Sequence, residues 1–277
     1  MDELILCVAP YPGEAQHEKF EGKLDVAAEV LRSYDEGASI AHLHVRDQEG
    51  RQTTDPTVFE QDVARIRSVS AMIIEGSTGG APEHTLEERC VSFKVPGIEM
   101  GSLNLGSVNM NGTVYRNPWP DIRFYATELH RRGIKPFLCV FDLSMFSNVT
   151  RLEAEGLLTT PHVFNFVFDI PDALPFTPKH LDIFLDLLPK GASWFLTRHG
   201  HRNGWEDFRW ALERGGHVRV GFEDSPFLAG GRRANSNAEL VWEIAEAGRR
   251  MGRKVVGPDR AREILKLPSR SERSGTR

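Results

Sequence analysis

The sequence predicts an α/β protein built as a single (β/α)8 barrel. Eight short runs rich in β-branched and aromatic residues alternate with eight amphipathic stretches along the chain. Strands that alternate with helices form parallel sheets, and eight such units match a closed barrel of about 250 residues. An open, doubly wound sheet is the alternative architecture for the same alternation.

The strand candidates are short and apolar, as expected for strands that are buried on both faces. They span residues 4–10, 39–46, 71–77, 97–105, 135–142, 162–169, 193–199 and 217–224.

The helical candidates carry apolar residues three and four positions apart, and several have recognisable ends. Gly37 and Gly133 occupy C-terminal cap positions, and Pro118 and Pro178 lie near helix starts. The predicted helices span residues 22–36, 57–69, 83–92, 118–132, 146–156, 178–188, 204–214 and 236–251.

The chain shows no internal linker. Residues 1–267 are predicted to form the barrel domain, and residues 268–277, "PSRSERSGTR", a flexible polar tail. Hydrophobic residues make up 40% and charged residues 26% of the chain, with a net charge of −5, which is ordinary for a globular protein.

Composition also argues against several partners and locations. Basic residues are spread out, so a nucleic-acid partner is not expected. The acidic start does not resemble a secretory signal, and no apolar run approaches the roughly 18 residues of a membrane span. Three cysteines without a CxxC pair favour reduced thiols, and therefore a cytoplasmic protein.

Polar residues at the C-terminal ends of the strands carry the functional expectation, because active sites of such barrels lie at that face. Eleven candidates follow from this rule: His42, His44, Ser77, Thr78, Ser102, Asn104, Asp142, Arg219, Glu223 and Asp224, with Glu14 in the loop after the first strand.

The stretch "HLHVRD" (42–47) predicts half of a metal site. Residues two apart on a strand share a face, so His42 and His44 project side by side. The first, second and eighth strands are neighbours in a closed barrel, which brings Glu223 within reach of both histidines. Two histidines and one carboxylate, with a free fourth position, are typical of catalytic zinc.

Two further motifs carry polar groups that could bind a ligand. The turn "GSTGG" (76–80) offers backbone N–H groups and two hydroxyls that suit a small carboxylate, unless it is simply a flexible turn. The pair His199 and His201 in "RHGHRNG" (198–204) is interpreted as a surface loop feature.

Several motifs in register resemble the β-keto acid cleavage enzymes over nearly the whole chain: "GASIAHLHVRDQEGR", "GSTGG", "SLNLGS", "GHVRVGFEDS", "SNAELV" and "GPDRAREIL". That family is a (β/α)8 barrel with one catalytic zinc per chain, usually a homotetramer. It condenses a β-keto acid with acetyl-CoA and releases acetoacetate and a new acyl-CoA.

The resemblance implies a role for every one of these candidates except Asp142. His42, His44 and Glu223 fall on the zinc ligands, and Arg219, Asp224 and Glu14 on the catalytic cluster. Asp224 is expected to be the base that Arg219 and Glu14 orient. The residues implied to bind the substrate are Ser77, Thr78 and Gly80, which hold its carboxylate, and Ser102 and Asn104, which line the site.

Three departures from the family pattern concern the substrate tail and CoA. Phe137 and Cys139 stand where glutamates are common, and Cys139 is expected to face the tail, which removes the counter-charge for a cation. Arg198 replaces a small or neutral residue and favours a neutral-polar or anionic tail if it faces the site. The loop "DIPDALPF" (169–176) stands where the family has a glycine-rich turn, so the resemblance does not extend to CoA contacts at this loop.

Two other functions remain open at this stage. A zinc-dependent amidohydrolase-type barrel also uses His-x-His, but needs further histidines at the ends of strands five and six, where Asp142 and Asp169 stand. A non-catalytic protein that binds small acids is the second alternative.

Overall fold

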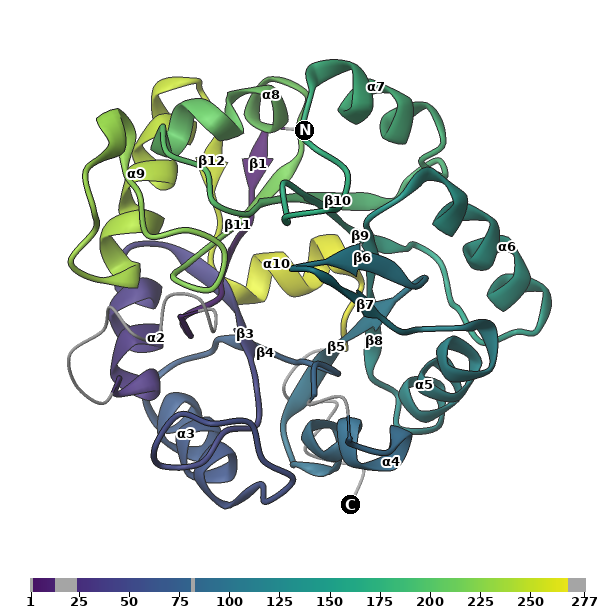
Figure 1. Cartoon of the computed structure of the whole chain (residues 1–277). Helices are drawn as coiled ribbons and strands as arrows, with labels where there is room; N and C mark the ends of the chain where they lie inside the picture. The colour runs from purple at the N-terminus through teal and green to yellow at the C-terminus, as the bar shows by residue number, and fades with distance from the viewer. Residues whose placement is uncertain (1, 13–23, 81–82, 269–277) are drawn as a thin grey trace.

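A computed structural model describes residues 2–12, 24–80 and 83–268. Eight parallel strands close into a barrel in the order β10-β11-β2-β3-β4-β5-β8-β9. Helices surround this barrel, as Figure 1 shows in a view along its axis. The predicted (β/α)8 architecture is confirmed, and the open-sheet alternative is wrong because the ring of strand pairs has no edge.

Each barrel strand overlaps one predicted run but is shorter. The strand predicted to reach Asp224 ends at Val220, and residues 221–224 form a turn. The barrel strands are β2 (Leu6–Val8), β3 (Ala38–Leu43), β4 (Ile73–Gly76), β5 (Ile98–Asn104), β8 (Lys135–Val140), β9 (Val163–Phe168), β10 (Ser193–Arg198) and β11 (His217–Val220).

The helices begin with side-chain caps at several positions. Asp25 accepts a hydrogen bond from the backbone N–H of Ala28 over 2.9 Å, and Ser236 caps the last helix of the repeat in the same way. The helices of the repeat are α2 (Val26–Asp35), α3 (Thr57–Val69), α4 (Leu86–Arg89), α5 (Trp119–Arg131), α6 (Phe146–Ala154), α7 (Pro178–Asp186), α8 (Arg209–Glu213) and α9 (Asn237–Arg250).

Two predicted helices are partly 3-10 turns. The stretch 83–92 contains only the short α4, followed by η1 (Val91–Lys94), and the stretch 204–214 begins as η3 (Gly204–Phe208) before α8. Two further 3-10 turns follow barrel strands: η2 (Leu143–Met145) and η4 (Ala229–Gly231).

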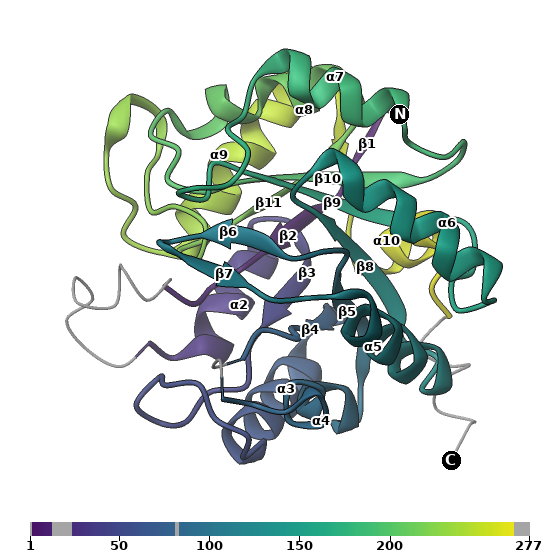
Figure 2. The same ribbon diagram turned by 45° about the vertical axis from the view of Figure 1, so that its right-hand side comes forward.

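Three features of the fold were not predicted. The pair β1 (Glu3–Leu4) and β12 (Lys254–Val255) forms a small parallel sheet. The hairpin of β6 (Val108–Met110) and β7 (Thr113–Tyr115) follows the C-terminal end of β5, and α10 (Pro258–Leu265) ends the described chain. In Figures 1 and 2 the hairpin and α10 lie on opposite sides of the barrel.

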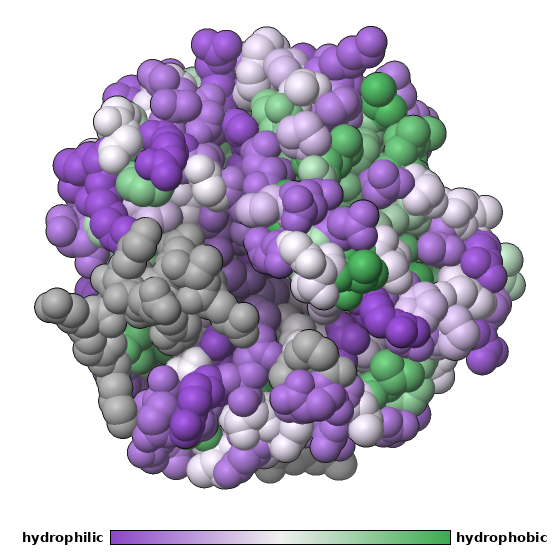
Figure 3. Space-filling view, viewed as in Figure 1, coloured by the Kyte–Doolittle hydropathy of each residue, from purple (hydrophilic) through white to green (hydrophobic). Residues whose placement is uncertain are grey.

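One end of the barrel is closed by apolar packing. Ile40, Ile73, Met100 and neighbouring inward residues form a core cluster with Ala261 and Leu265 of α10. Arg262 of α10 also pairs with the buried Glu99, with Nε to Oε2 at 2.8 Å. Chemistry is therefore left to the other end, which Figure 3 shows as a hollow with mainly hydrophilic surroundings.

Within the described ranges, none of the helices has both the length and the apolar character that crossing a membrane requires.

Candidate active site

Polar side chains line the barrel above its apolar plug because successive inward positions on a strand lie two residues apart. On β3 the inward series begins with Ile40 and continues with His42, and His44 follows directly after the strand. On β4, Glu75 follows Ile73. Since β3 and β4 are paired with His42 opposite Glu75, these polar groups meet inside the barrel.

Three of the predicted residues come together as a group that could hold a metal ion. The ligand atoms of His42, His44 and Glu223 all lie within 4.8 Å of one another. His42 Nε2 and His44 Nε2 are 3.1 Å apart, and each lies 3.4 Å from an oxygen of Glu223. Among the described residues it is the one group of three or more histidine, cysteine, aspartate or glutamate side chains whose ligand atoms lie close enough together to hold a metal ion.

A carboxylate behind His42 fixes the orientation of its ring. Nδ1 of His42 contacts Glu75 Oε2, and the other carboxylate oxygen of Glu75 accepts a hydrogen bond from Ser102 Oγ over 2.6 Å. In the neutral ring this pairing places the proton of His42 on Nδ1 and leaves Nε2 as the nitrogen that can bind a metal. Carboxylates that orient metal-binding histidines in this way are usual behind metal sites.

The electrostatics of the group favour a cation at its centre. Burial and Arg219 lower the pKa of His42, but Glu75 and Glu223 outweigh them and raise it to about 9. Burial raises the pKa of Glu223, whereas Arg219, His42 and His44 hold it well below its usual range. The group is therefore built around an anionic carboxylate that attracts positive charge.

The donor set fits a divalent ion of the zinc type. Two nitrogens about 2.0–2.1 Å from a tetrahedral zinc lie roughly 3.3 Å from each other, close to the observed spacing. Glu223 Oε2 is buried without a hydrogen-bond partner in the described part of the chain. An unpartnered carboxylate oxygen beside two ring nitrogens is the arrangement that a metal ion would satisfy.

Glu223 and Asp224 both reach the site because they lie in a turn and not, as predicted, on a strand, which would point them to opposite faces. Gly221 starts this turn with φ of +154°, and a Cβ there would lie 2.1 Å from the carbonyl oxygen of Ala9. The turn brings both carboxylates to Arg219, which bonds to Glu223 Oε1 at 2.6 Å and to both oxygens of Asp224.

The interpretation of His199 and His201 as surface residues is wrong. His201 is 5% exposed and packs edge-on against Phe208. His199 follows β10 directly, and its Nε2 lies 3.5 Å from Asp224 Oδ1. Burial lowers the pKa of His199, so a neutral imidazole contacts the buried Asp224.

The turn at 76–80, which was predicted to hold a carboxylate, lies beside the metal-type group of His42, His44 and Glu223. A Cβ at Gly79 would come within 2.8 Å of His44 Cε1, and one at Gly80 within 2.8 Å of Arg89 Cγ. Ser77 Oγ accepts the N–H of Gly79 over 2.9 Å, and the Thr78 hydroxyl donates to the carbonyl of Ser102. Glycine at both positions allows the turn to pack directly against these side chains.

A neutral wall completes the mouth. Asn104 on β5 is paired in register with Cys139 on β8, and Asn165 and Thr197 continue it on β9 and β10. Thr197 donates to Asn165 Oδ1 over 2.7 Å, and burial raises the pKa of the Cys139 thiol to about 12. The Thr197–Asn165 pair and the Cys139 thiol are therefore uncharged hydrogen-bonding partners.

Two candidates are not brought into this group. Arg198 is separated from it because Nε pairs with Asp169 at 2.7 Å, Nη1 pairs with Asp207 at 3.1 Å, and the guanidinium stacks on Phe176. Asp142 caps η2 by accepting the N–H of Ser144. Glu14 lies outside the described residues.

Sequence reasoning missed Glu75 and Tyr115, and it assigned His199 to a surface loop. Glu75 is a single acid on the same strand face as Ser77, and His199 lies two residues after the inward Thr197. Counting inward positions would have identified both. Tyr115 belongs to the unpredicted hairpin.

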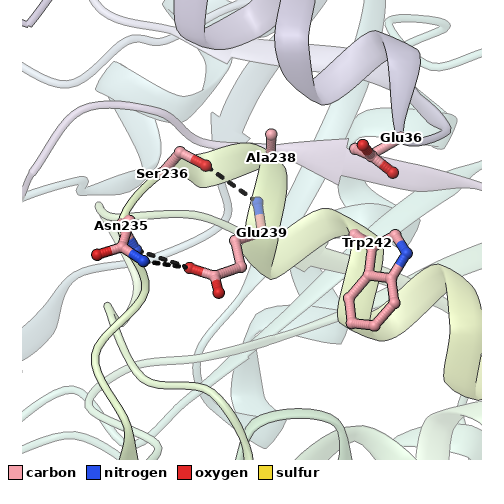
Figure 4. Close-up of a pocket in the computed structure, with 6 residues that line it drawn as sticks. All are labelled: Glu36, Asn235, Ser236, Ala238, Glu239 and Trp242. Carbon is pink, nitrogen blue, oxygen red and sulfur yellow. Dashed lines mark hydrogen bonds between the residues drawn. The ribbon is translucent and has the colours of Figure 1, made fainter.

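A second hollow, shown in Figure 4, lies at the surface around the start of α9. It is lined by Glu36, Asn235, Ser236, Ala238, Glu239 and the half-exposed Trp242. The backbone N–H of Glu239 donates to Ser236, the N-cap of α9, and its carboxylate accepts the N–H of Asn235. None of the candidate site residues lines this hollow.

Known proteins similar to this chain carry a consistent set of names. Residues 20–267 match the model of the family described as beta-keto acid cleavage enzyme. A 3-keto-5-aminohexanoate cleavage enzyme of Acetoanaerobium sticklandii is 36% identical over 272 residues, covering 96% of this chain and 98% of the relative. A 3-oxoadipate:acetyl-CoA acetyltransferase of Cupriavidus necator is 33% identical, covering 86% and 84%.

A solved structure supports the fold. The apo structure of ObcA superimposes with a TM-score of 0.71 at 18% identity, covering 87% of this chain. This chain spans 64% of the length of ObcA.

Proposed function

Because this chain belongs to the beta-keto acid cleavage enzyme family, we propose that it condenses a β-keto acid with acetyl-CoA and releases acetoacetate and a new acyl-CoA. The observation that carries the proposal is the convergence of His42, His44 and Glu223 beside the buried Arg219–Asp224 pair. The first group offers a cation site, and the second offers a carboxylate for proton transfer.

The three convergent side chains are proposed to hold one Zn²⁺ per chain. When bound, the ion would supply Lewis-acid polarisation of the substrate ketone. Glu75 would keep Nε2 of His42 directed at it through the contact with Nδ1.

Asp224 is proposed as the base that removes a proton from the carbon between the two carbonyl groups. Arg219 fixes the carboxylate plane with two hydrogen bonds, and Glu14 is proposed to assist this orientation. Ser77, Thr78 and Gly80 are proposed to hold the substrate carboxylate, with Ser102 and Asn104 lining the site. The turn's position beside His44 supports this arrangement.

The remaining steps balance without another reactant. The carbanion attacks the thioester carbonyl of acetyl-CoA, and the CoA thiolate leaves. The thiolate then attacks the former ketone carbon, and the bond between this carbon and the α-carbon breaks. The acyl group leaves as acyl-CoA, and the acetoacetate carbanion takes its proton back from Asp224.

The substrate tail is proposed to be uncharged or anionic. Cys139 and its neighbours Asn165 and Thr197 are neutral, and Glu75 is occupied by His42 and Ser102. No carboxylate in the described part of this wall is left to pair with an ammonium group.

The amidohydrolase-type alternative receives no specific support. Asp142 caps a helix turn and Asp169 pairs with Arg198, so neither extends the metal-type group. A homotetramer in the cytoplasm remains part of the proposal, and light scattering of the purified protein would measure the assembly.

One assay tests the function. Purified zinc-loaded protein is incubated with acetyl-CoA and β-keto acids of different tails, and acetoacetate and acyl-CoA are quantified by mass spectrometry. Coupled formation of both products is expected. Acetoacetate or another product formed equally well without acetyl-CoA would indicate a hydrolase, and no turnover across the panel would favour an acid-binding protein.

Two neighbouring variants separate the assigned roles. Glu223→Ala should lower metal content, whereas Asp224→Asn should retain the metal and lose turnover. Equal loss of metal in both variants would refute the division between ligand and base.

A further inference from the structure

The hairpin β6–β7 carries a tyrosine to the rim of the active site. The hydroxyl of Tyr115, at the end of β7, accepts a hydrogen bond from Nδ2 of Asn104 over 3.1 Å. Asn104 is the last inward residue of β5 and is paired in register with Cys139. The hydroxyl therefore lies where β5 and β8 open into the mouth.

Both ends of the hairpin are fixed. At its tip the N–H of Asn111 donates to the carbonyl of Pro171, and the N–H of Gly112 donates to Asp172 Oδ2 over 2.7 Å. At its base the N–H of Asn117 donates to Ser107 Oγ over 2.8 Å. The divergent loop after β9 thus holds the hairpin across the mouth (Figure 1).

The hydroxyl of Tyr115 accepts two hydrogen bonds from the protein and has no charged acceptor for its own proton among the described residues. Arg89 Nη2 donates to the same oxygen over 2.7 Å, so two N–H groups occupy its acceptor positions. Its other polar neighbour is the neutral side chain of Asn117, a weak acceptor that a substrate oxygen can replace. Burial raises the pKa of Tyr115, so the phenol stays protonated and can donate.

Positive charge lies directly behind this hydroxyl. The Arg89 guanidinium packs against the rings of Tyr115 and Tyr125, with centroid distances of 5.2 and 5.1 Å. Its hydrogen-bond partners in the described ranges are all uncharged: the carbonyl of Thr78, the hydroxyl of Tyr115 and the amide oxygen of Asn117. Such a cation strengthens the phenol as a donor and disfavours a second cation nearby.

We propose that Tyr115 donates its hydroxyl proton to an oxygen on the tail of the β-keto acid, and thereby selects substrates whose tail carries an oxygen acceptor. The inference rests on the proposed function for the identity of the ligand. The turn at Ser77–Gly80 already serves the carboxylate, and the metal-type group lies on β3 and after β11. The rim at Asn104 and Cys139 is the side that remains for the tail.

The test uses four six-carbon β-keto acids that differ only at C5, which is a methylene, a hydroxyl-bearing carbon, a carbonyl or an ammonium-bearing carbon. Binding to the zinc-loaded protein is measured by calorimetry without acetyl-CoA. The wild type should bind the 5-carbonyl acid about tenfold more tightly than the 5-methylene acid, as one well-placed hydrogen bond allows. The 5-ammonium acid should bind most weakly.

Tyr115→Phe removes only the hydroxyl and should abolish the preference, while affinity for the 5-methylene acid stays within about twofold. Tyr125→Phe is the matched control, because Tyr125 also packs on Arg89 but its buried hydroxyl has no hydrogen-bond partner among the described residues. It should retain the preference.

Two outcomes would overturn the inference. A preference that survives Tyr115→Phe would show that the hydroxyl does not contact the tail. A uniform loss across all four acids would place the contact at the shared carboxylate instead. Turnover with acetyl-CoA is measured separately, so a failure of the proposed function would appear as absent products while the binding ratios still decide the role of Tyr115.

Discussion

Arg219 grips Asp224 with two hydrogen bonds, from Nε to Oδ2 over 3.0 Å and from Nη2 to Oδ1 over 2.8 Å. A lysine cannot reproduce this two-pronged geometry. Arg219→Lys should therefore lower kcat about 10- to 100-fold, as expected for the loss of one charged hydrogen bond, while zinc content stays unchanged. Steady-state kinetics and elemental analysis of the same preparation measure both quantities.

Arg198→Lys is the control for this change, because Arg198 pairs with Asp169 and Asp207 away from the site. It should leave kcat within about twofold. Loss of zinc in Arg219→Lys would instead mean that Arg219 supports the ligand Glu223 more than the base.

Glu75→Gln should weaken zinc binding about 10- to 100-fold without unfolding the barrel, because it removes the carboxylate that orients His42. Competition with a chelating dye measures the affinity without any assay of activity. Ser102→Ala removes only the hydrogen bond from Ser102 to the other oxygen of Glu75, so it should lower zinc affinity much less. Equal affinities of wild type and Glu75→Gln would contradict the orienting role.

The parts of the site that sequence reasoning identified depend on local periodicity. His42 and His44 share a strand face because alternation within a strand does not depend on the rest of the fold. Glu75 follows the same rule relative to Ser77. Even the hairpin left a signal, since Asn111 and Gly112 form an Asn-Gly turn, and both have positive φ angles of 51° and 74°.

The remaining features depend on contacts between distant segments. The turn at 221–224 forms where the chain passes the carbonyl of Ala9. Gly221 is the one signal of this turn in "HVRVGFED", but glycine also occurs within strands, so it does not by itself distinguish the turn from a longer strand. The same limit applies to Arg198, which faces two acids from other segments of the chain, Asp169 and Asp207. The spacing of residues along the chain does not specify whether a long side chain reaches the active site or acids on neighbouring segments.

Gly79→Ala should disturb the metal-type group because the added methyl group displaces the ring of His44. The added Cβ would lie 2.8 Å from Cε1 and 3.2 Å from Nδ1 of His44, so the ring must move. Zinc affinity should fall by about tenfold or more, because small shifts of a ligand are costly. Gly257→Ala is the control, since φ is −76° and nothing lies within 4 Å of its added Cβ. Unchanged zinc affinity in Gly79→Ala would show that His44 is free to move or does not bind the ion.

His217 should make the folded protein less stable in mild acid. Its ring is fully buried and Nδ1 accepts the N–H of Ile5 over 3.2 Å, and burial together with Arg253 lowers its pKa to about 3. The unfolded chain, with a histidine pKa near 6.5, binds a proton that the folded chain refuses as pH falls below that value. The free energy of unfolding should therefore fall by up to about 1.4 kcal/mol per pH unit from this residue, between about pH 6.5 and pH 3.

His217→Asn keeps an acceptor for the N–H of Ile5 and removes the buried titrating ring. The free energy of unfolding of this variant should depend less steeply on pH, by the equivalent of one bound proton, as measured by urea unfolding between pH 7 and pH 5. Parallel curves for wild type and His217→Asn would contradict the assignment.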